Sequence, residues 1–275
     1  MNNGIQIHKK TWQYFALAYG WSWIFLMPPV LAGLDANQPL TIGLRALSGI
    51  GPALSALFLL YTADTPQGRR EYWKRLISFR SIKIPWWIVI LFTPLALLLI
   101  SGGIALLMGE WGIQLESGLP EAASPLGWLG LLLFILFFGP VPEEMGWRGY
   151  ALDGLQNRWS SLFSSLILGV AWSLWHLPLF FIEGTYQANL GIFSDKFWVF
   201  SVLMIPESIL MTWVYNNTSR STLSAILFHF AINFTGEIFF VSPIVNWINF
   251  GLWMVAAGLI VGFTDPKTFQ RKRNL

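Results

Sequence analysis

The chain has no cysteine among its 275 residues, so disulfides, thiolate metal sites and cysteine nucleophiles are all excluded. Charge is also scarce. Only 11% of the residues are Asp, Glu, Lys or Arg, whereas about 25% are charged in ordinary soluble proteins. With 55% hydrophobic residues and a mean hydropathy of +0.55, the composition predicts an all-α, polytopic transmembrane helix bundle embedded in a lipid bilayer.

Other absences narrow the class of protein further. The chain shows no internal repeat, no low-complexity tract and no soluble domain, so we expect a single integral membrane domain over residues 1–275. The His-Glu-x-x-His, Gly-x-Ser-x-Gly and Gly-x-Gly-Asp motifs of other membrane hydrolases are missing. The sequence pI is about 9.2, but the basic residues follow membrane topology, and we expect no nucleic-acid partner.

Eight apolar segments are each near the roughly 20 residues that a membrane-spanning helix needs. The first is too long for a signal peptide and has no small-residue cleavage site after it, so we expect it to be retained. The eight predicted spans are 12–34, 43–62, 86–108, 126–139 with the acidic segment that follows, 160–182, 197–215, 222–240 and 243–264.

The charged residues indicate how these spans are oriented. Every Lys and Arg except Arg45 and Lys196 falls on the side that carries both termini, including Lys272 and Arg273 in the tail. The positive-inside rule therefore predicts cytoplasmic termini and places the acidic segment toward the cytoplasmic half. The opposite side carries most of the loop acids, namely Asp35, Glu110, Glu116, Glu121, Glu183 and Asp195.

Small residues mark two spans as sites of close helix packing. Ser161, Ser165, Gly169 and Ser173 recur at four-residue spacing in the fifth span, and Gly258 and Gly262 do so in the eighth. Such stripes let helices approach closely, and we expect packing within the chain rather than dimerisation. The basic and aromatic run 69–80 predicts either a short helix at the membrane surface or an ordinary loop.

Two adjacent glutamates, Glu143 and Glu144, follow an apolar run that has no charge. Ionised carboxylates in a membrane are costly, at roughly 2.5–3.5 kcal/mol each, and usually serve a function. If Pro142 begins a new helix, both fall in its first turn, where the helix dipole favours negative charge. Arg148 follows Glu144 by four residues, so the two can pair. We therefore predict that Glu144 and Arg148 brace the segment and that Glu143 acts as a base. The alternative is that both glutamates simply end a span.

Two histidines also lie within or at the ends of apolar spans. His176 comes two residues before Pro178, which predicts a helix end or kink at that point. His229 and Asn233 are four residues apart and share one helix face, which Glu237 extends by another four. Alone, each of these residues is as well explained by hydrogen bonds that hold the bundle together.

Together these polar residues make a hydrolytic set. Glu143 and His176 would activate a water molecule, while His229 and Asn233 would donate hydrogen bonds to the tetrahedral intermediate. The same groups, Glu143, His176 and His229, could instead bind a divalent metal such as zinc. Glu207, another acid within a span, is expected to be structural or to lie on a substrate path.

At these residues the chain resembles the CAAX-protease and bacteriocin-processing (CPBP, or Abi) family of intramembrane endopeptidases, which includes the type II CAAX prenyl proteases. The family's Glu-Glu-x-x-x-Arg motif stands here as Glu143 to Arg148, and its His-x-x-x-Asn motif as His229 to Asn233. Its aromatic-x-x-x-His motif stands as Trp172 to His176, although Phe or Tyr is more usual at the first position. The resemblance covers about residues 126–240.

The resemblance implies an eight-helix bundle with a water-filled cavity that faces the cytoplasm, in what we expect to be a prokaryotic plasma membrane. It implies hydrolysis of a peptide or lipidated-protein substrate near the membrane surface, either CAAX-type prenyl-protein processing or maturation of bacteriocins and other membrane peptides. It carries Glu143, His176, His229 and Asn233 over as catalytic, with Glu144 and Arg148 in support. A glutamate-activated water that needs no cofactor is the favoured mechanism.

Two other classes of function also fit membrane-embedded Glu and His residues. A transporter or channel could use them as an ion or proton path, but such proteins often contain inverted repeats, and here the polar groups cluster instead of lining a path. A non-catalytic immunity protein could keep the fold, but the three motifs are intact, which favours a working enzyme.

Overall fold

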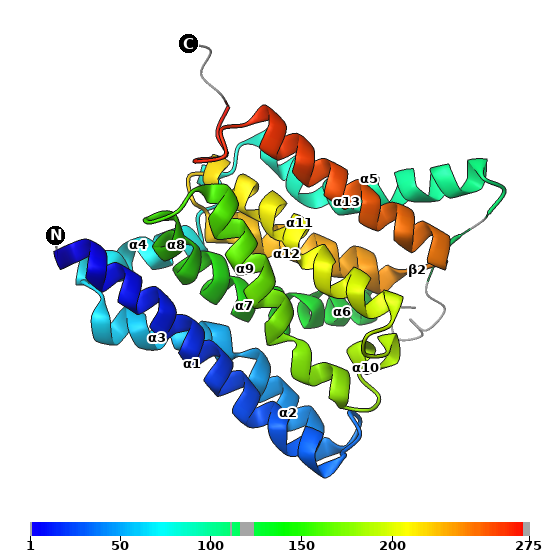
Figure 1. Ribbon diagram of the computed structural model, residues 1–275, viewed down its shortest axis with the longest axis horizontal. Coiled ribbons are helices and arrows are strands. Elements are labelled where there is room, and N and C mark those ends of the chain that lie inside the picture. The colour runs from blue at the N-terminus through cyan, green and yellow to red at the C-terminus, as the bar shows by residue number, and fades with distance from the viewer. Residues whose placement is uncertain (1, 111, 116–123, 272–275) are drawn as a thin grey trace.

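The structure, a computed structural model, describes residues 2–110, 112–115 and 124–271 and is an all-α bundle, as predicted (Figure 1). Four residues used in the charge distribution, Glu116, Glu121, Lys272 and Arg273, lie outside this range. The helices are α1 (Asn2–Ala32), α2 (Pro39–Gly49), α3 (Gly51–Ala63), α4 (Pro66–Leu76), η1 (Phe79–Ser81), α5 (Ile84–Leu107), α6 (Pro125–Phe137), α7 (Pro140–Gly146), the π-helix η3 (Trp147–Ala151), α8 (Leu152–Gln156), α9 (Ser161–Trp175), η4 (Leu177–Phe181), α10 (Tyr186–Leu190), α11 (Asp195–Asn217), α12 (Thr222–Ile238) and α13 (Pro243–Phe263).

The predicted spans correspond closely to these helices. Within the described residues, six helical segments are long and apolar enough to cross a membrane, and the pair α2–α3, bent by 41°, makes a seventh. The remaining predicted span, 222–240, is α12, whose 17 residues are somewhat shorter than a bilayer requires. The basic run forms the short helix α4.

Serine residues fix where several of these helices begin. A serine at the N-cap accepts a hydrogen bond from a backbone N–H that has no partner within the helix. A serine begins four of the long helices in this way. The caps are Ser160 for α9, Ser194 for α11, Ser221 for α12 and Ser242 for α13.

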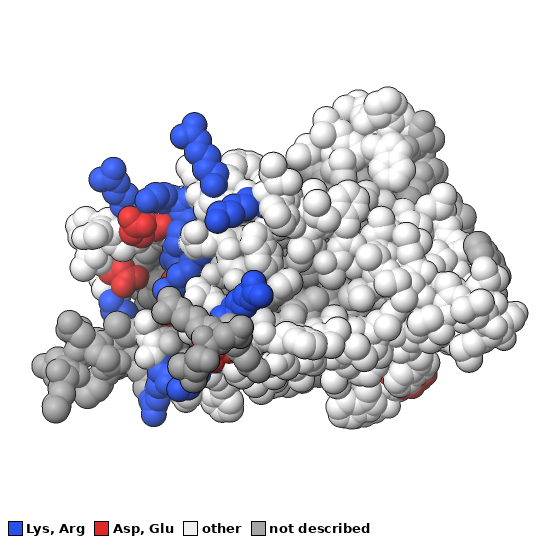
Figure 2. All heavy atoms as spheres, turned by 90° about the horizontal axis from the view of Figure 1, so that it is seen from above, with Lys and Arg blue, Asp and Glu red and all other residues white. Residues whose placement is uncertain are grey.

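The two ends of the bundle differ sharply in charge. Figure 2 shows Lys and Arg gathered at one end of the visible face, over the region of α4 and the two termini, while most of that face is uncharged. Asp153 of α8 anchors this end, because it pairs with Arg75 and with Arg220 (2.8 Å) and accepts a hydrogen bond from Tyr215 (2.9 Å). Burial alone would lower the pKa of Arg75, but Tyr215 and Asp153 together raise it, so the guanidinium stays charged.

The opposite end carries a two-stranded antiparallel sheet. Strand β1 (Ile113–Leu115) pairs with β2 (Phe239–Val241), with Gln114 opposite Phe240. The strand β2 directly follows α12, so this short ribbon ties the end of α12 to the segment after α5 (Figure 1).

Two glycines in the core, Gly146 and Gly169, allow close helix packing. A Cβ on Gly169 of α9 would lie 2.9 Å from Cα of Ile205, so the prediction of close packing is confirmed here. It is wrong for Gly258 of α13, where a Cβ would meet nothing within 4 Å.

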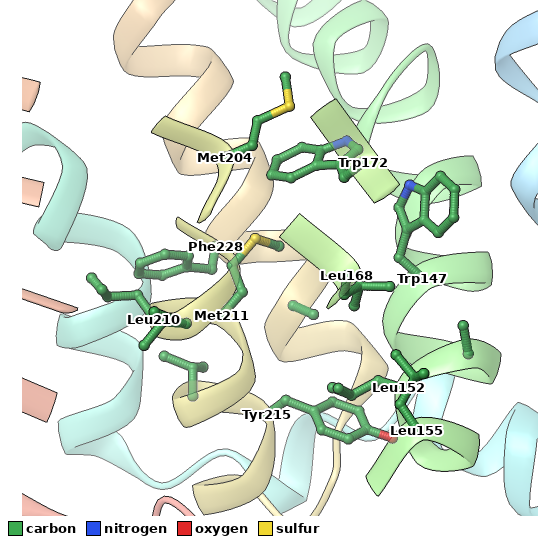
Figure 3. Close-up of a cluster of buried hydrophobic side chains, with 14 of the residues drawn as sticks. Trp147, Leu152, Leu155, Leu168, Trp172, Met204, Leu210, Met211, Tyr215 and Phe228 are labelled. Carbon is green, nitrogen blue, oxygen red and sulfur yellow. The ribbon is translucent and has the colours of Figure 1, made fainter. Parts of the chain in front are cut away.

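Figure 3 shows the apolar cluster that α8, η3, α9, α11 and α12 build between them. It contains Trp147, Leu152, Leu155, Leu168, Trp172, Met204, Leu210, Met211, Tyr215 and Phe228.

Replacing Gly146 by alanine is expected to destabilise the bundle by about 1–3 kcal/mol, because the new methyl group overfills a packed core. Its Cβ would lie 2.2 Å from the Tyr14 hydroxyl oxygen and 2.6 Å from the carbonyl oxygen of Pro52. Thermal unfolding in detergent measures the change. The matched control is Gly258→Ala, which should leave the stability unchanged or raise it by up to about 1 kcal/mol. Equal melting temperatures for the two variants would contradict the packing at Gly146.

Candidate active site

A break between two helices positions the glutamate pair. Helix α6 ends at Phe137, and α7 begins at Pro140, two residues earlier than predicted from Pro142. Proline lacks an N–H and suits the first turn of a helix, and Glu143 follows in that same turn. Both carboxylates are buried, Glu143 with 7% of its surface exposed and Glu144 with none. The pair therefore lies inside the bundle, and the alternative of a simple span end is wrong.

Glu144 connects two helices through its carboxylate. The Arg148 Nη1 atom donates to both of its oxygens, at 2.8 and 3.0 Å, which confirms the predicted pair. The Nδ1 atom of His229 lies 3.0 Å from the same carboxylate. Since a carboxylate only accepts hydrogen bonds, Nδ1 carries the proton and donates it. Glu144 thus fixes the imidazole of His229 with its Nε2 atom turned away from the pair.

Trp172 of α9 contacts the other residues of the site. Its indole N–H donates to Oε2 of Glu143 at 2.6 Å, its ring meets His229 edge-on at 4.9 Å between centroids, and Arg148 lies over its face at 5.3 Å. Its carbonyl oxygen lies 2.9 Å from Nδ1 of His176. Trp172 therefore holds Glu143 and packs against His229 through its side chain, and orients His176 through its backbone carbonyl.

His176 ends α9 at the C-cap, as predicted from Pro178, which opens η4 with Leu177. Because the Trp172 carbonyl can only accept, the Nδ1 atom of His176 carries the proton and the neutral ring offers Nε2 as an acceptor. The ring packs edge-on against Trp175 and Phe200, at 4.8 and 5.7 Å between centroids. These contacts leave the orientation of the imidazole well defined.

Asn233 approaches Glu143 from α12, across Gly139. A Cβ on Gly139 would lie 3.2 Å from the Asn233 amide nitrogen and 3.8 Å from Oε1 of Glu143. Glycine at this position therefore keeps the space between the amide and the carboxylate open. Asn233 lies one turn beyond His229 on the same helix, as predicted, and Glu237 follows at an exposed position near the helix end.

Several of these groups keep a free polar atom. Oε1 of Glu143 and the Nε2 atoms of His176 and His229 form no hydrogen bond among the described residues. Other polar atoms in the described residues are both unpaired and shut off from solvent, but these three atoms are not among them. These three atoms therefore face accessible space, where a water molecule or a substrate can reach them.

The metal alternative does not fit the observed geometry. In the parts of the chain that the structure describes, no three His, Asp or Glu side chains gather as a group that could hold a metal ion. The described residues therefore give the metal alternative no support.

A cavity of about 740 Å³ opens at the basic end of the bundle, but the site lies elsewhere. Its described lining includes Tyr72, Arg75 and Gly149 and none of the four predicted catalytic residues. Burial raises the pKa of Tyr72, whose hydroxyl group donates to the carbonyl of Met145. Trp172 lies about 16 Å along α9 from Ser161, at 1.5 Å per residue. The site is therefore well separated from the start of α9.

Sequence reasoning missed two contacts in this site. The spacing of the motif identified Trp172 only as the aromatic residue four positions before His176. Because tryptophan, unlike phenylalanine, carries an N–H donor, a hydrogen bond to a carboxylate could have been predicted from the residue type. The bond between Glu144 and His229 joins residues 85 positions apart, which no local spacing reveals. Both contacts turn separate motifs into one connected group.

Comparison with known proteins tests the family resemblance that the sequence motifs indicate. Residues 125–235 match the family model described as type II CAAX prenyl endopeptidase Rce1-like, which confirms the family resemblance over this part of the chain. A curated relative, CAAX prenyl protease 2 of Methanococcus maripaludis, is 39% identical over 145 residues. This match covers 51% of the present chain and 52% of the relative, so the chain spans about half the length of the curated relative that it matches.

Proposed function

We propose that this protein is an intramembrane endopeptidase that hydrolyses a peptide bond with a water molecule activated by Glu143. The observation that carries the proposal is the Glu143 carboxylate, held at Oε2 by Trp172 and open at Oε1 on the side of Gly139 and Asn233. The match of residues 125–235 to a prenyl endopeptidase family supports it, because every proposed catalytic residue lies within that segment.

In the proposed reaction, Glu143 acts first as a base and then as an acid. Oε1 of Glu143 takes a proton from water while the water oxygen bonds to the scissile carbonyl carbon. The Nε2 atom of His176 accepts the second O–H of that water and orients it. When the C–N bond breaks, the proton held by Glu143 passes to the leaving nitrogen, which departs as an amine. The carboxylate is then restored for another cycle.

His229 and Asn233 stabilise the oxyanion that forms when water attacks. The Asn233 amide donates one hydrogen bond. The Nδ1 proton of His229 is already committed to Glu144, so donation from Nε2 uses the doubly protonated ring, whose positive charge pairs with the Glu144 carboxylate. Arg148 holds Glu144 in place for this purpose.

The substrate and its side of approach follow from the same proposal. The basic end of the bundle faces the cytoplasm of a prokaryotic plasma membrane, according to the positive-inside rule, and the substrate is a peptide or lipidated protein. We favour cleavage of CAAX-type prenylated proteins, since the matched family model and the relative both carry that description. Processing of bacteriocins or other membrane peptides is the alternative.

Cleavage of a quenched farnesyl-CAAX peptide by the purified protein in detergent tests this function. We expect release of the fluorophore by the wild-type protein. The same peptide without the farnesyl group, and an unprenylated membrane peptide, show whether the lipid is required. Turnover of the unprenylated peptide alone would favour membrane-peptide processing, and no turnover of any peptide would contradict the proposed activity.

Trp172→Phe is expected to lower kcat by about 10- to 100-fold, which corresponds to loss of one hydrogen bond to a charged group. Phenylalanine keeps the aromatic packing against His229 but cannot donate to Glu143. Because Phe is more usual at this position in the resembled family, we expect the variant to fold normally. Steady-state kinetics on the farnesyl peptide measure the effect. An unchanged kcat would show that the indole N–H does not position the base.

A further inference from the structure

Glu207 is a buried acid that the mechanism above does not use. It lies in α11 directly after Pro206, whose missing N–H removes one helical hydrogen bond. Helix α11 approaches α9 closely at this level, where a Cβ on Gly169 would lie 3.2 Å from Cβ of Ser208. Gly169 precedes Trp172 by about one turn, so Glu207 belongs to the stretch of α11 that faces the site.

The surroundings of Glu207 place it beside the proposed catalytic group. Only 6% of its surface is exposed, and the charges that act on it most come from His229 and Arg148. Figure 3 shows Met204, three residues earlier on α11, in the same apolar cluster as Trp172. Glu207 is therefore a third carboxyl group next to the residues that would act on the scissile bond.

The carboxyl group of Glu207 also has no partner in the described part of the protein. No hydrogen bond or ion pair to it is formed there, and its oxygens are not among the buried polar atoms that are cut off from solvent. A polar group at membrane depth is costly, so it usually has a functional partner. This carboxyl group instead faces accessible space near His229.

A peptide that enters the membrane interior brings polar groups of its own. Each backbone N–H and C=O left without a partner there costs several kcal/mol. The proposed catalytic residues act on the scissile bond and leave the neighbouring peptide groups unpaired. A proteolytic site at this depth therefore needs further polar side chains that face the substrate backbone.

We propose that Glu207 is a substrate-contacting residue, whose carboxyl group hydrogen-bonds to the backbone of an extended peptide next to the scissile bond. This inference rests on the proposed function, since it assigns a further contact in the same site. It predicts that the enzyme recognises the peptide backbone near the cleaved bond through α11. Glu207 takes no part in the transfer of the proton.

The test combines Glu207 variants with altered peptides. Glu207→Gln keeps a hydrogen-bonding group and should retain kcat/KM within about threefold, while Glu207→Leu should lower it by about 10- to 100-fold, as loss of a buried hydrogen bond predicts. The probe is the farnesyl-CAAX peptide that the wild-type protein cleaves. Glu183→Leu, which removes an exposed carboxylate from a loop, is the matched control and should change nothing.

A set of ester-substituted peptides distinguishes substrate contact from a structural role. Each peptide replaces one amide outside the scissile bond by an ester, which removes an N–H and weakens a C=O. At one position we expect the ester to lower kcat/KM about tenfold for the wild type and less than threefold for Glu207→Leu, because the contact is already lost. This ratio does not depend on the fraction of folded enzyme. Glu207→Met replaces the leucine variant if the latter cannot be purified.

Equal ester effects in wild type and variant at every position would overturn the proposal, as would full activity of Glu207→Leu. Failure of the wild-type protein to cleave any peptide would instead contradict the proposed function. The two failures are therefore distinguishable, because the first requires an active wild-type enzyme.

Discussion

Glu143→Gln is expected to lower kcat on the farnesyl peptide by at least about 10³-fold, within the range that a general base contributes. The amide has the size and shape of the carboxylate but cannot take a proton from water. Its oxygen can still accept the indole N–H of Trp172, so the surrounding structure should be preserved. The expected loss is therefore in kcat, with little change in KM.

Two controls make this result specific. Glu183→Gln changes an exposed carboxylate and should retain full activity. The melting temperature of Glu143→Gln in detergent should equal that of the wild type, or exceed it, because a buried charge has been removed. Activity within about tenfold of wild type would show that Glu143 is not the base, since general-base catalysis contributes more than this.

The fold could be predicted from the sequence to a large extent, because a membrane makes hydrophobic length the dominant signal. Each of the eight apolar segments contains a helix, and even the break before the glutamates was signalled by Pro140 and Pro142. The bend between α2 and α3 was not predicted, because the break at Ile50, just before Pro52, leaves the segment uniformly apolar. Hydropathy measures solvent preference and is blind to such geometry.

The site could be predicted only where its contacts are local. The pair between Glu144 and Arg148 follows from their spacing on one helix. The link from Glu144 to His229, and that from Trp172 to Glu143, depend on how α7, α9 and α12 pack, which a single sequence does not specify. The packing itself depends on positions such as Gly169, where two helices approach more closely than a side chain would allow.

Single substitutions in the fully buried ion pair of Glu144 and Arg148 are expected to lower the stability of the protein strongly. Arg148→Met is expected to destabilise the protein by about 3–5 kcal/mol, because it leaves a buried carboxylate without its main counter-charge. Glu144→Leu should cost a similar amount by stranding the guanidinium. Both side chains are 0% exposed, so solvent cannot compensate for the loss. Thermal and denaturant unfolding in detergent measure these changes.

A partly exposed ion pair provides the matched control. Lys10 and Asp64 also approach to within 2.9 Å, but 26% and 28% of their side chains are exposed. Asp64→Asn should therefore cost at most about 1 kcal/mol, as is usual for pairs in contact with water. Equal losses of stability for Asp64→Asn and Arg148→Met would contradict the interpretation that burial makes the pair of Glu144 and Arg148 essential for stability.

The double variant Glu144→Leu/Arg148→Met separates the stabilising role of this pair from its role in the reaction. Replacing both charges removes the desolvation penalty along with the attraction, so the double variant should recover most of the stability that either single variant loses. Its activity should remain at least about 100-fold below wild type, as loss of a catalytic donor predicts. The reason is that His229 has lost the carboxylate that accepts its Nδ1 proton. A stable and active double variant would show that Glu144 does not position His229. A double variant as unstable as the single ones would show that the pair stabilises the bundle through contacts other than its charges.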